Sequence, residues 1–232
     1  MTGTFTELGL ALLLFIGAHS LPSVRPLRAY LADQLGESGY LWIYSMVSVS
    51  CTFWIVVAAI AAPPLELWPM TVAGMWVTDA AMVLSTWLLM IGLTSPNPLS
   101  IRVQAAAYDP ADPGAAAVTR HPILWSIAVW GLAHLAANGD GGSALLFAGS
   151  AAYCMAGATV LDARRRREMG ESEWRRLAAP TSFVPFAAIL SGRSGMPWRA
   201  VCGWRLVAAA AVYVLALQLH RLVLGVSPLP PF

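Results

Sequence analysis

Long apolar runs separated by short polar segments make up most of this chain. Most of these runs have about the 20 residues that a helix needs to cross the hydrocarbon core of a bilayer. The pattern predicts six membrane helices, at residues 4–24, 39–62, 71–93, 122–137, 142–161 and 204–224. The first and the fourth are the shortest uninterrupted runs. Both contain a histidine, so we expect them to face protein rather than lipid.

The segments between the runs contain residues that end helices. Residues 62–69 include three prolines, so they end the second span. Residues 138–142 read Asn-Gly-Asp-Gly-Gly and predict a tight turn that makes the fourth and fifth spans an antiparallel hairpin. The arginine run 164–167 continues the fifth helix beyond the membrane, where interleaved glutamates pair with part of its charge. The broken segment 180–197 is expected along the membrane interface, and 1–232 is expected to be one domain.

Composition supports a membrane protein and excludes other classes. Hydrophobic residues make up 58% of the chain and charged residues only 11%, whereas an average soluble domain carries about 25% charge. So few charges cannot cover a soluble globule, and disordered chains are rich in charge. A net charge of +2 indicates no nucleic-acid partner. The spacing of Cys51, Cys154 and Cys202 fits neither a zinc site nor a disulfide framework. The fold class is therefore an all-α, six-helix polytopic membrane bundle.

All 14 cationic side chains are arginines, and they are distributed unevenly among the loops. Arg25 and Arg28 lie between the first two spans, and Arg102 and Arg120 lie between the third and fourth. Eight more follow the fifth span, whereas the alternate loops contain acidic residues and no arginine. The positive-inside rule places the arginine-containing loops in the cytoplasm and both termini on the outer side.

Two histidines inside the spans are candidate metal ligands. His19 follows Gly17 and Ala18, and His134 follows Ala133 with Gly131 one turn earlier. Small neighbours allow a helix or a flat cofactor to approach the backbone. Neutral imidazole is a common ligand of haem iron, and ionisable residues inside a membrane are functional candidates. The structural alternatives are a helix-end histidine bonded to a carbonyl for His19, and an interfacial histidine for His134.

Three other ionisable residues have less certain roles. His121 precedes Pro122 at the start of the fourth span, where ion binding and simple capping are equally compatible with the sequence. His220 is adjacent to Arg221, which favours a structural role, although a His134–His220 ligand pair remains open. Asp79 is the only acid well inside a span, and its estimated depth of about 12 Å matches that of His134. We therefore consider Asp79 as a hydrogen-bond acceptor for a metal-bound His134. The alternatives are that it snorkels toward the outer interface or bonds the hydroxyl of Thr78 or Ser85.

At these residues the chain resembles the NnrU family of bacterial membrane proteins and its distant relative, 15-cis-zeta-carotene isomerase. The matching stretches run in family order from residue 7 to about 176. They are Gly17-Ala18-His19-Ser20 with Arg25 and Arg28, Arg120-His121-Pro122-Ile123-Leu124-Trp125, Ala133-His134-Leu135-Ala136 with Asn138-Gly139-Asp140, and Leu161-Asp162-Ala163-Arg164-Arg165-Arg166.

The resemblance implies a multi-pass protein of the bacterial inner membrane with one haem b, and the arginine distribution makes its termini periplasmic. The isomerase's ligand histidines correspond to His19 and His134. Arg25, Arg28 and Arg120 are the nearest cations for haem propionates. The implied partners are membrane lipid, a redox partner or a lipophilic polyene that undergoes cis-trans isomerisation, and a nitric oxide reductase, since NnrU members are associated with denitrification.

One departure and two alternatives complete these expectations. The isomerase has a cysteine one turn before its second ligand, where this chain has Gly131, which puts ligand switching and isomerase activity in doubt. The alternatives are a non-enzymatic accessory factor for a membrane nitric oxide reductase and an S-adenosylmethionine-dependent methyltransferase. The latter rests on His121, Asp162 and Trp174, which resemble the isoprenylcysteine methyltransferase group with substitutions at key positions.

Overall fold

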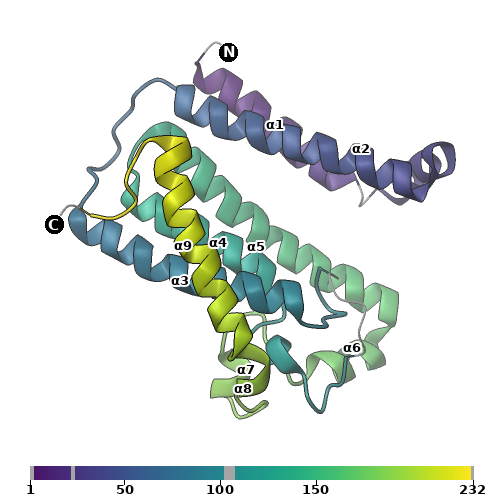
Figure 1. The fold of residues 1–232 in the computed structure, drawn as a ribbon. Helices are drawn as coiled ribbons and strands as arrows, with labels where there is room; N and C mark the ends of the chain where they lie inside the picture. Colours follow the sequence, from purple (N-terminus) through teal and green to yellow (C-terminus); the bar gives the residue numbers. More distant parts are fainter. Residues whose placement is uncertain (1–2, 22–23, 102–107, 231–232) are drawn as a thin grey trace. The chain divides into compact units, whose positions relative to one another are not determined.

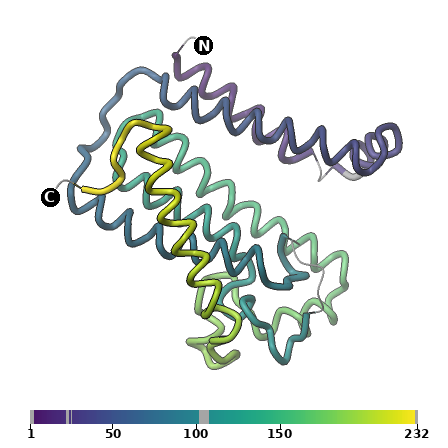
Figure 2. The backbone as a smooth tube through the Cα atoms, viewed as in Figure 1, coloured from purple at the N-terminus to yellow at the C-terminus, as the bar shows by residue number. Residues whose placement is uncertain are grey.

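The computed structural model describes residues 3–21, 24–101 and 108–230, except for the side chain of Arg25, and the described residues form helices joined by turns and loops, without strands (Figures 1 and 2). Arg102, which entered the topology argument, lies outside the described residues. The elements are α1 (Phe5–Ser20), α2 (Arg25–Ala61), α3 (Val72–Thr94), η2 (Gly114–Ala117), α4 (Pro122–Ala137), α5 (Gly141–Met169), α6 (Glu171–Ala178), α7 (Ala187–Leu190), α8 (Trp198–Val201) and α9 (Trp204–Leu224).

The chain divides into two compact units. The first comprises residues 1–69 and 138–146, and the second comprises residues 70–137 and 147–232. The helix α5 therefore begins in the first unit and continues in the second. Each unit is described by itself.

In the first unit, α1 packs along α2 through an apolar core (Figure 1). The buried members of this core are Leu8, Ala11, Ile55, Ala58 and Ala59. The segment after α2 pairs with the turn before α5, since Leu67 N–H donates to the carbonyl of Gly139 at 2.7 Å. A Cβ atom on Gly139 would lie 1.7 Å from the carbonyl oxygen of Trp68, so this close approach requires glycine.

The start of α2 differs from the sequence prediction. Residues 25–38 were expected to be a loop, but α2 begins at Arg25 and runs to Ala61. Pro26 lies in the first turn, where its missing N–H is no loss and its fixed φ suits a helix. Gly36, with φ 72° and ψ 155°, kinks the helix before the apolar part begins. The charged half of α2 is thus a helical extension of the second apolar run.

In the second unit, α3 packs closely along α4. A Cβ atom on Gly92 would lie 2.6 Å from the side chain of Ile123, so the two backbones approach closely there. Further along, the Ser85 hydroxyl donates to the carbonyl of Ser126 and the Thr78 hydroxyl donates to the carbonyl of Ala133, each at 2.9 Å. Small and hydroxyl-bearing residues are the usual means of joining helices where the surroundings are apolar.

The helix α4 also packs against α5 in antiparallel fashion, as the predicted hairpin requires. Ala128 of α4 shares a buried cluster with Ala151 and Cys154 of α5. Residues 138–140 form the turn between the two helices. The continuation of α5 to Met169 and its arginine–glutamate pairs confirm the prediction for the arginine run.

Within the described residues, four helical segments have the length and composition to cross a membrane: Pro26–Ala61, Val72–Thr94, Gly141–Met169 and Trp198–Leu224. The helices α1 and α4 are apolar but have only 16 residues each, or about 24 Å of helix, which is less than the ~30 Å hydrocarbon core. The chain is therefore an all-helical membrane protein, and the count of six spans remains a prediction.

Candidate functional site

His19 lies in the last turn of α1, in the first unit. Its Nδ1 atom is 3.0 Å from the carbonyl oxygen of Phe15, one turn earlier, so Nδ1–H donates this bond. The Phe15 ring lies beside the imidazole at 3.9 Å between centroids, and Tyr44 of α2 meets its edge at 6.1 Å. A Cβ atom on Gly17 would meet no described atom within 4 Å. The turn before His19 thus has an open backbone face, which fits the approach of a flat ligand.

His134 lies in the last turn of α4, in the second unit. Its Nδ1 atom is 2.9 Å from the carbonyl oxygen of Trp130, again one turn earlier. The rings of Trp130 and Phe147 flank the imidazole at 5.2 and 5.0 Å between centroids. The imidazole is therefore held between aromatic rings from α4 and α5.

The two candidate ligands share one local geometry. A neutral imidazole carries one N–H, and in both residues Nδ1 uses it to bond the carbonyl of residue i−4. This bond places the lone pair of the ring on Nε2. Metal-bound histidines in proteins usually donate their other ring N–H to a carbonyl or carboxylate in this way. The predicted helix-end bonding of His19 is present, and it is compatible with ligation rather than an alternative to it.

Gly131 has a packing role that the sequence alone does not reveal. A Cβ atom at this position would lie 2.7 Å from the carbonyl oxygen of Phe147 and 3.4 Å from Ala151, so α5 leaves no room for a side chain. The isomerase resemblance places a cysteine here. In this chain a cysteine at position 131 requires α4 and α5 to separate.

Asp79 is 7% exposed on α3 and interacts with the hydroxyl of Tyr213 on α9. Its Oδ2 atom is buried and has no hydrogen-bond partner among the described residues. The neighbouring hydroxyls that the sequence offered bond elsewhere, Thr78 to backbone carbonyls and Ser85 to Ser126. No hydrogen bond joins Asp79 to His134 in the described part of the chain. The sequence did not point to Tyr213, because Asp79 and Tyr213 are 134 positions apart in the chain and no spacing rule links them.

His121 is fully buried, at 0% exposure, at the arginine-rich end of the second unit. Its Nε2 atom is 2.8 Å from Oδ1 of Asp162 on α5, and its Nδ1 atom is 2.8 Å from the hydroxyl of Ser100. Arg120 lies 3.5 Å from the same carboxylate and stacks over the ring of Trp174. Both ring nitrogens therefore have partners within the chain, which makes His121 a poor ligand for a cofactor and a strong link between α4 and α5.

A family model confirms the resemblance that these motifs suggested. It describes the NnrU protein and matches residues 7–228. The chain belongs to the NnrU family. A search of curated proteins and a search of solved structures found no match.

The cations proposed for haem propionates have partners of their own in this NnrU-family chain. Arg28 pairs with Glu37 and lies over the ring of Tyr40. Arg120 is engaged by Asp162, and burial lowers its pKa while that carboxylate opposes the change. Arg120 and His134 also lie at opposite ends of α4. Arg25 begins α2, and its side chain lies outside the described residues.

His220, the remaining candidate histidine of the NnrU chain, bonds to the segment that follows α9. His220 contacts the carbonyl of Val226 through Nδ1 at 3.0 Å, just beyond the end of α9. This contact agrees with a structural role. Among the described residues, no group of three or more histidine, cysteine or acidic side chains is arranged to hold a metal ion. A haem iron does not need such a group, since the porphyrin supplies four of its ligands.

Proposed function

We propose that this NnrU-family chain is a membrane protein in which His19 and His134 would hold a b-type haem. The observation that carries the proposal is their common geometry, in which Nδ1–H bonds the carbonyl of residue i−4 and leaves the lone pair on Nε2. A fixed ring orientation and a fixed tautomer are what a ligand histidine requires. The aromatic rings beside each imidazole favour a flat apolar ligand and keep water away.

Two imidazoles would hold the haem iron, which directs the proposal toward electron transfer. When bound, haem supplies an iron that alternates between the ferric and ferrous states. A polyene substrate would have to displace one imidazole, and Gly131 offers no alternative ligand. Exchange of electrons with a redox partner needs no displacement. We therefore propose a haem-containing redox or accessory role. Because the family is associated with nitric oxide reduction, the partner we propose is a membrane nitric oxide reductase.

The methyltransferase alternative has less support from the geometry. It requires His121 to contact S-adenosylmethionine, yet this ring is fully buried and is bonded on both nitrogens by Ser100 and Asp162. A structural role for this histidine accounts for the same contacts.

The visible spectrum of the purified protein tests the proposal. We expect a Soret band with the sharp bands of low-spin haem, and no carbon monoxide adduct on the reduced protein, because both axial positions are filled. His19→Ala and His134→Ala should each lose the low-spin spectrum, and added imidazole should restore it. His220→Ala is the matched control and should leave the spectrum unchanged. A colourless wild-type protein, or a normal low-spin spectrum in either ligand variant, contradicts the assignment.

A further inference from the structure

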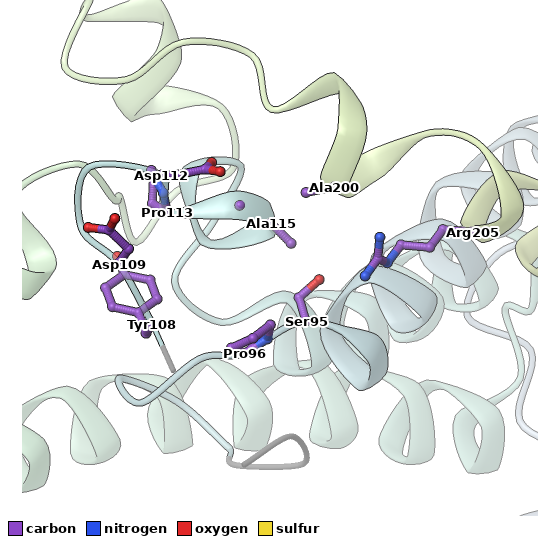
Figure 3. A pocket seen from close by; sticks show the side chains of 10 residues that line it. Ser95, Pro96, Tyr108, Asp109, Asp112, Pro113, Ala115, Ala200 and Arg205 are labelled. Atoms are coloured by element: carbon purple, nitrogen blue, oxygen red, sulfur yellow. The ribbon is translucent and has the colours of Figure 1, made fainter. Parts of the chain in front are cut away.

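A cavity of about 100 Å³ lies at the arginine-rich end of the second unit, open to the surface on one side (Figure 3). Ser95 and Arg205 line one side of it, and Asp109 and Asp112 line the other. A single buried water needs only about 10–15 Å³ by the same measure, so the cavity has room for a group of several heavy atoms. Neither the haem proposal nor the family assignment gives this cavity a role.

The hydroxyl of Ser95 is buried beside this cavity. Ser95 follows the last residue of α3 and is 6% exposed, and its oxygen has no hydrogen-bond partner among the described residues. Buried hydroxyls in native proteins are nearly always bonded to protein, to water or to a ligand. In Figure 3 the oxygen points into the cavity, toward the guanidinium of Arg205. This hydroxyl therefore marks a position for a polar group of a ligand.

Arg205 is fixed in place by contacts that leave part of its guanidinium available. Its Nε atom donates to the Thr94 hydroxyl at 2.7 Å, and Nη2 donates to the Thr94 carbonyl at 3.0 Å. The guanidinium also lies over the ring of Trp204, 4.9 Å from its centroid. Nη1 has no hydrogen-bond partner in the described part of the chain. A rigidly held guanidinium is well suited to binding phosphate oxygens.

The opposite side of the cavity is acidic. Oδ1 of Asp109 accepts the N–H of Ala111, which fixes the loop, whereas the exposed carboxylate of Asp112 has no hydrogen-bond or ion-pair partner among the described residues. A simple anion would be repelled by these acids, and a simple cation would be repelled by Arg205. The separated charges instead favour a dipolar ligand with an anionic end and a cationic end.

The position of the cavity indicates where such a ligand comes from. Ser95 and Arg205 lie at the ends of α3 and α9, both of which have the length and composition of membrane spans. Trp204 is 57% exposed and Trp198 is 66% exposed, and exposed tryptophans are typical of the membrane–water interface. Lipid headgroups occupy this depth.

We propose that this cavity binds a phosphoethanolamine group, the headgroup of a zwitterionic phospholipid. The phosphate accepts hydrogen bonds from Arg205 and Ser95, and the primary ammonium donates to Asp112, with Asp109 adding negative charge. The exposed apolar side chains of α9 next to the cavity, such as Leu206 and Val207, contact the acyl chains. The site does not depend on haem binding, so this proposal and the haem proposal can fail independently of each other.

Native mass spectrometry of the detergent-purified full chain tests this proposal with three defined lipids. We expect phosphatidylethanolamine to bind more tightly than phosphatidylcholine, whose quaternary ammonium donates no hydrogen bonds, and than anionic phosphatidylglycerol. Arg205→Gln should weaken phosphatidylethanolamine binding at least about tenfold, since each lost bond involves a charged group. Asp112→Asn should weaken it while leaving phosphatidylglycerol binding unchanged or stronger. Arg221→Gln, at the other end of α9, is the control and should have no effect.

A second arm separates the two sources of this headgroup. Displacement of the lipid by soluble glycerophosphoethanolamine would support recognition of the free headgroup, and retention of the lipid would support a lipid site that needs the acyl chains. If Arg205→Gln does not fold, Ser95→Ala provides a milder test and should weaken binding severalfold. Equal binding of all three lipids, or lipid binding unchanged in the folded Arg205→Gln and Asp112→Asn variants, overturns the proposal.

Discussion

The Nε2 atom of His121 lies 2.8 Å from the carboxylate of Asp162 and joins the start of α4 to α5. A carboxylate only accepts, so Nε2–H is the donor, and in the neutral ring Nδ1 accepts the hydroxyl of Ser100. This arrangement fixes the tautomer opposite to that of His19 and His134. His121 therefore differs in chemistry from His19 and His134, although the sequence presents each of the three beside small or helix-starting residues.

The first prediction concerns this buried pair. Asp162→Ala should destabilise the folded protein by about 1.5–3 kcal/mol, because it leaves the N–H of His121 without its acceptor and the guanidinium of Arg120 without its ion-pair partner. The measurement is the unfolding midpoint in a titration with sodium dodecyl sulfate in mixed micelles. Glu173→Gln removes a carboxylate that pairs with Arg176 at the surface and should leave the midpoint unchanged. Equal midpoints for Asp162→Ala and wild type would show that the buried pair contributes nothing.

The second prediction concerns the approach of α4 to α5. Gly131→Ala places a methyl group 2.7 Å from a backbone carbonyl and should cost about 1–3 kcal/mol of folding free energy. Gly157→Ala is the matched control on α5, where an added Cβ meets no described atom within 4 Å, and it should be neutral or slightly stabilising. The same unfolding titration compares the two variants. A fully stable Gly131→Ala protein would mean that the helices can separate without cost, which would reopen the position to a cysteine.

Much of the fold follows from hydrophobic pattern alone. The apolar runs, the proline-rich break after Ala61 and the turn before α5 all occur where the sequence predicted them, because membrane helices are specified by length and composition. The start of α2 was not predicted, because the apolar run that marked the second span begins only at Gly39. The helix extends before this run, since a helix that leaves the membrane can be as polar as any surface helix.

The candidate sites were less predictable than the fold. Residue type and position within a span singled out His19, His134 and Asp79, but their neighbours depend on which helices pack together. Tyr213 and Ser100 became visible only as contacts of Asp79 and His121. The interfacial cavity was not predicted either, because it is built from the ends of helices and from loops that carry no periodic signal.

The third prediction separates two roles for Asp79. With its carboxylate facing Tyr213, Asp79→Asn should leave the midpoint potential of the haem unchanged. If the carboxylate instead accepts the ring N–H of a haem-bound His134, its neutralisation should raise the potential, because a less basic imidazole stabilises ferric haem less. Redox titration of the haem-loaded variant decides between them. Tyr213→Phe is the companion variant, and in the first case it should lower stability by about 1 kcal/mol without changing the potential.

The fourth prediction is a pH dependence at the arginine-rich end. Hydrogen bonding from Arg166, followed by that from Arg175, lowers the pKa of Glu171 to about 2 from an ordinary value of 4.5. Because the folded-state value is the lower one, the stabilisation from this pair is fully present above about pH 4.5 and is lost as the pH falls toward 2. Arg166→Gln should return the pKa of Glu171 toward 4.5. A carboxyl-carbon NMR titration measures the pKa of Glu171 in the wild type and in Arg166→Gln. Glu173, which pairs with Arg176, should titrate identically in these two proteins.

The last prediction is the orientation in the membrane, which rests on the distribution of arginine. Eight arginines lie in residues 164–199, in the last turns of α5 and in the segment before α9, so the positive-inside rule places that region in the cytoplasm and the end of α9 on the periplasmic side. Ser172 and Ser227 make a matched pair for labelling, since both are exposed serines and lie on either side of α9 along the chain. In a background without the three native cysteines, a membrane-impermeant thiol reagent added outside spheroplasts should label Ser227→Cys and should not label Ser172→Cys. Disruption of the spheroplasts should make both thiols reactive, which controls for accessibility. Labelling of Ser172→Cys alone in intact spheroplasts would reverse the orientation, and with it the leaflet in which the proposed phosphoethanolamine site lies.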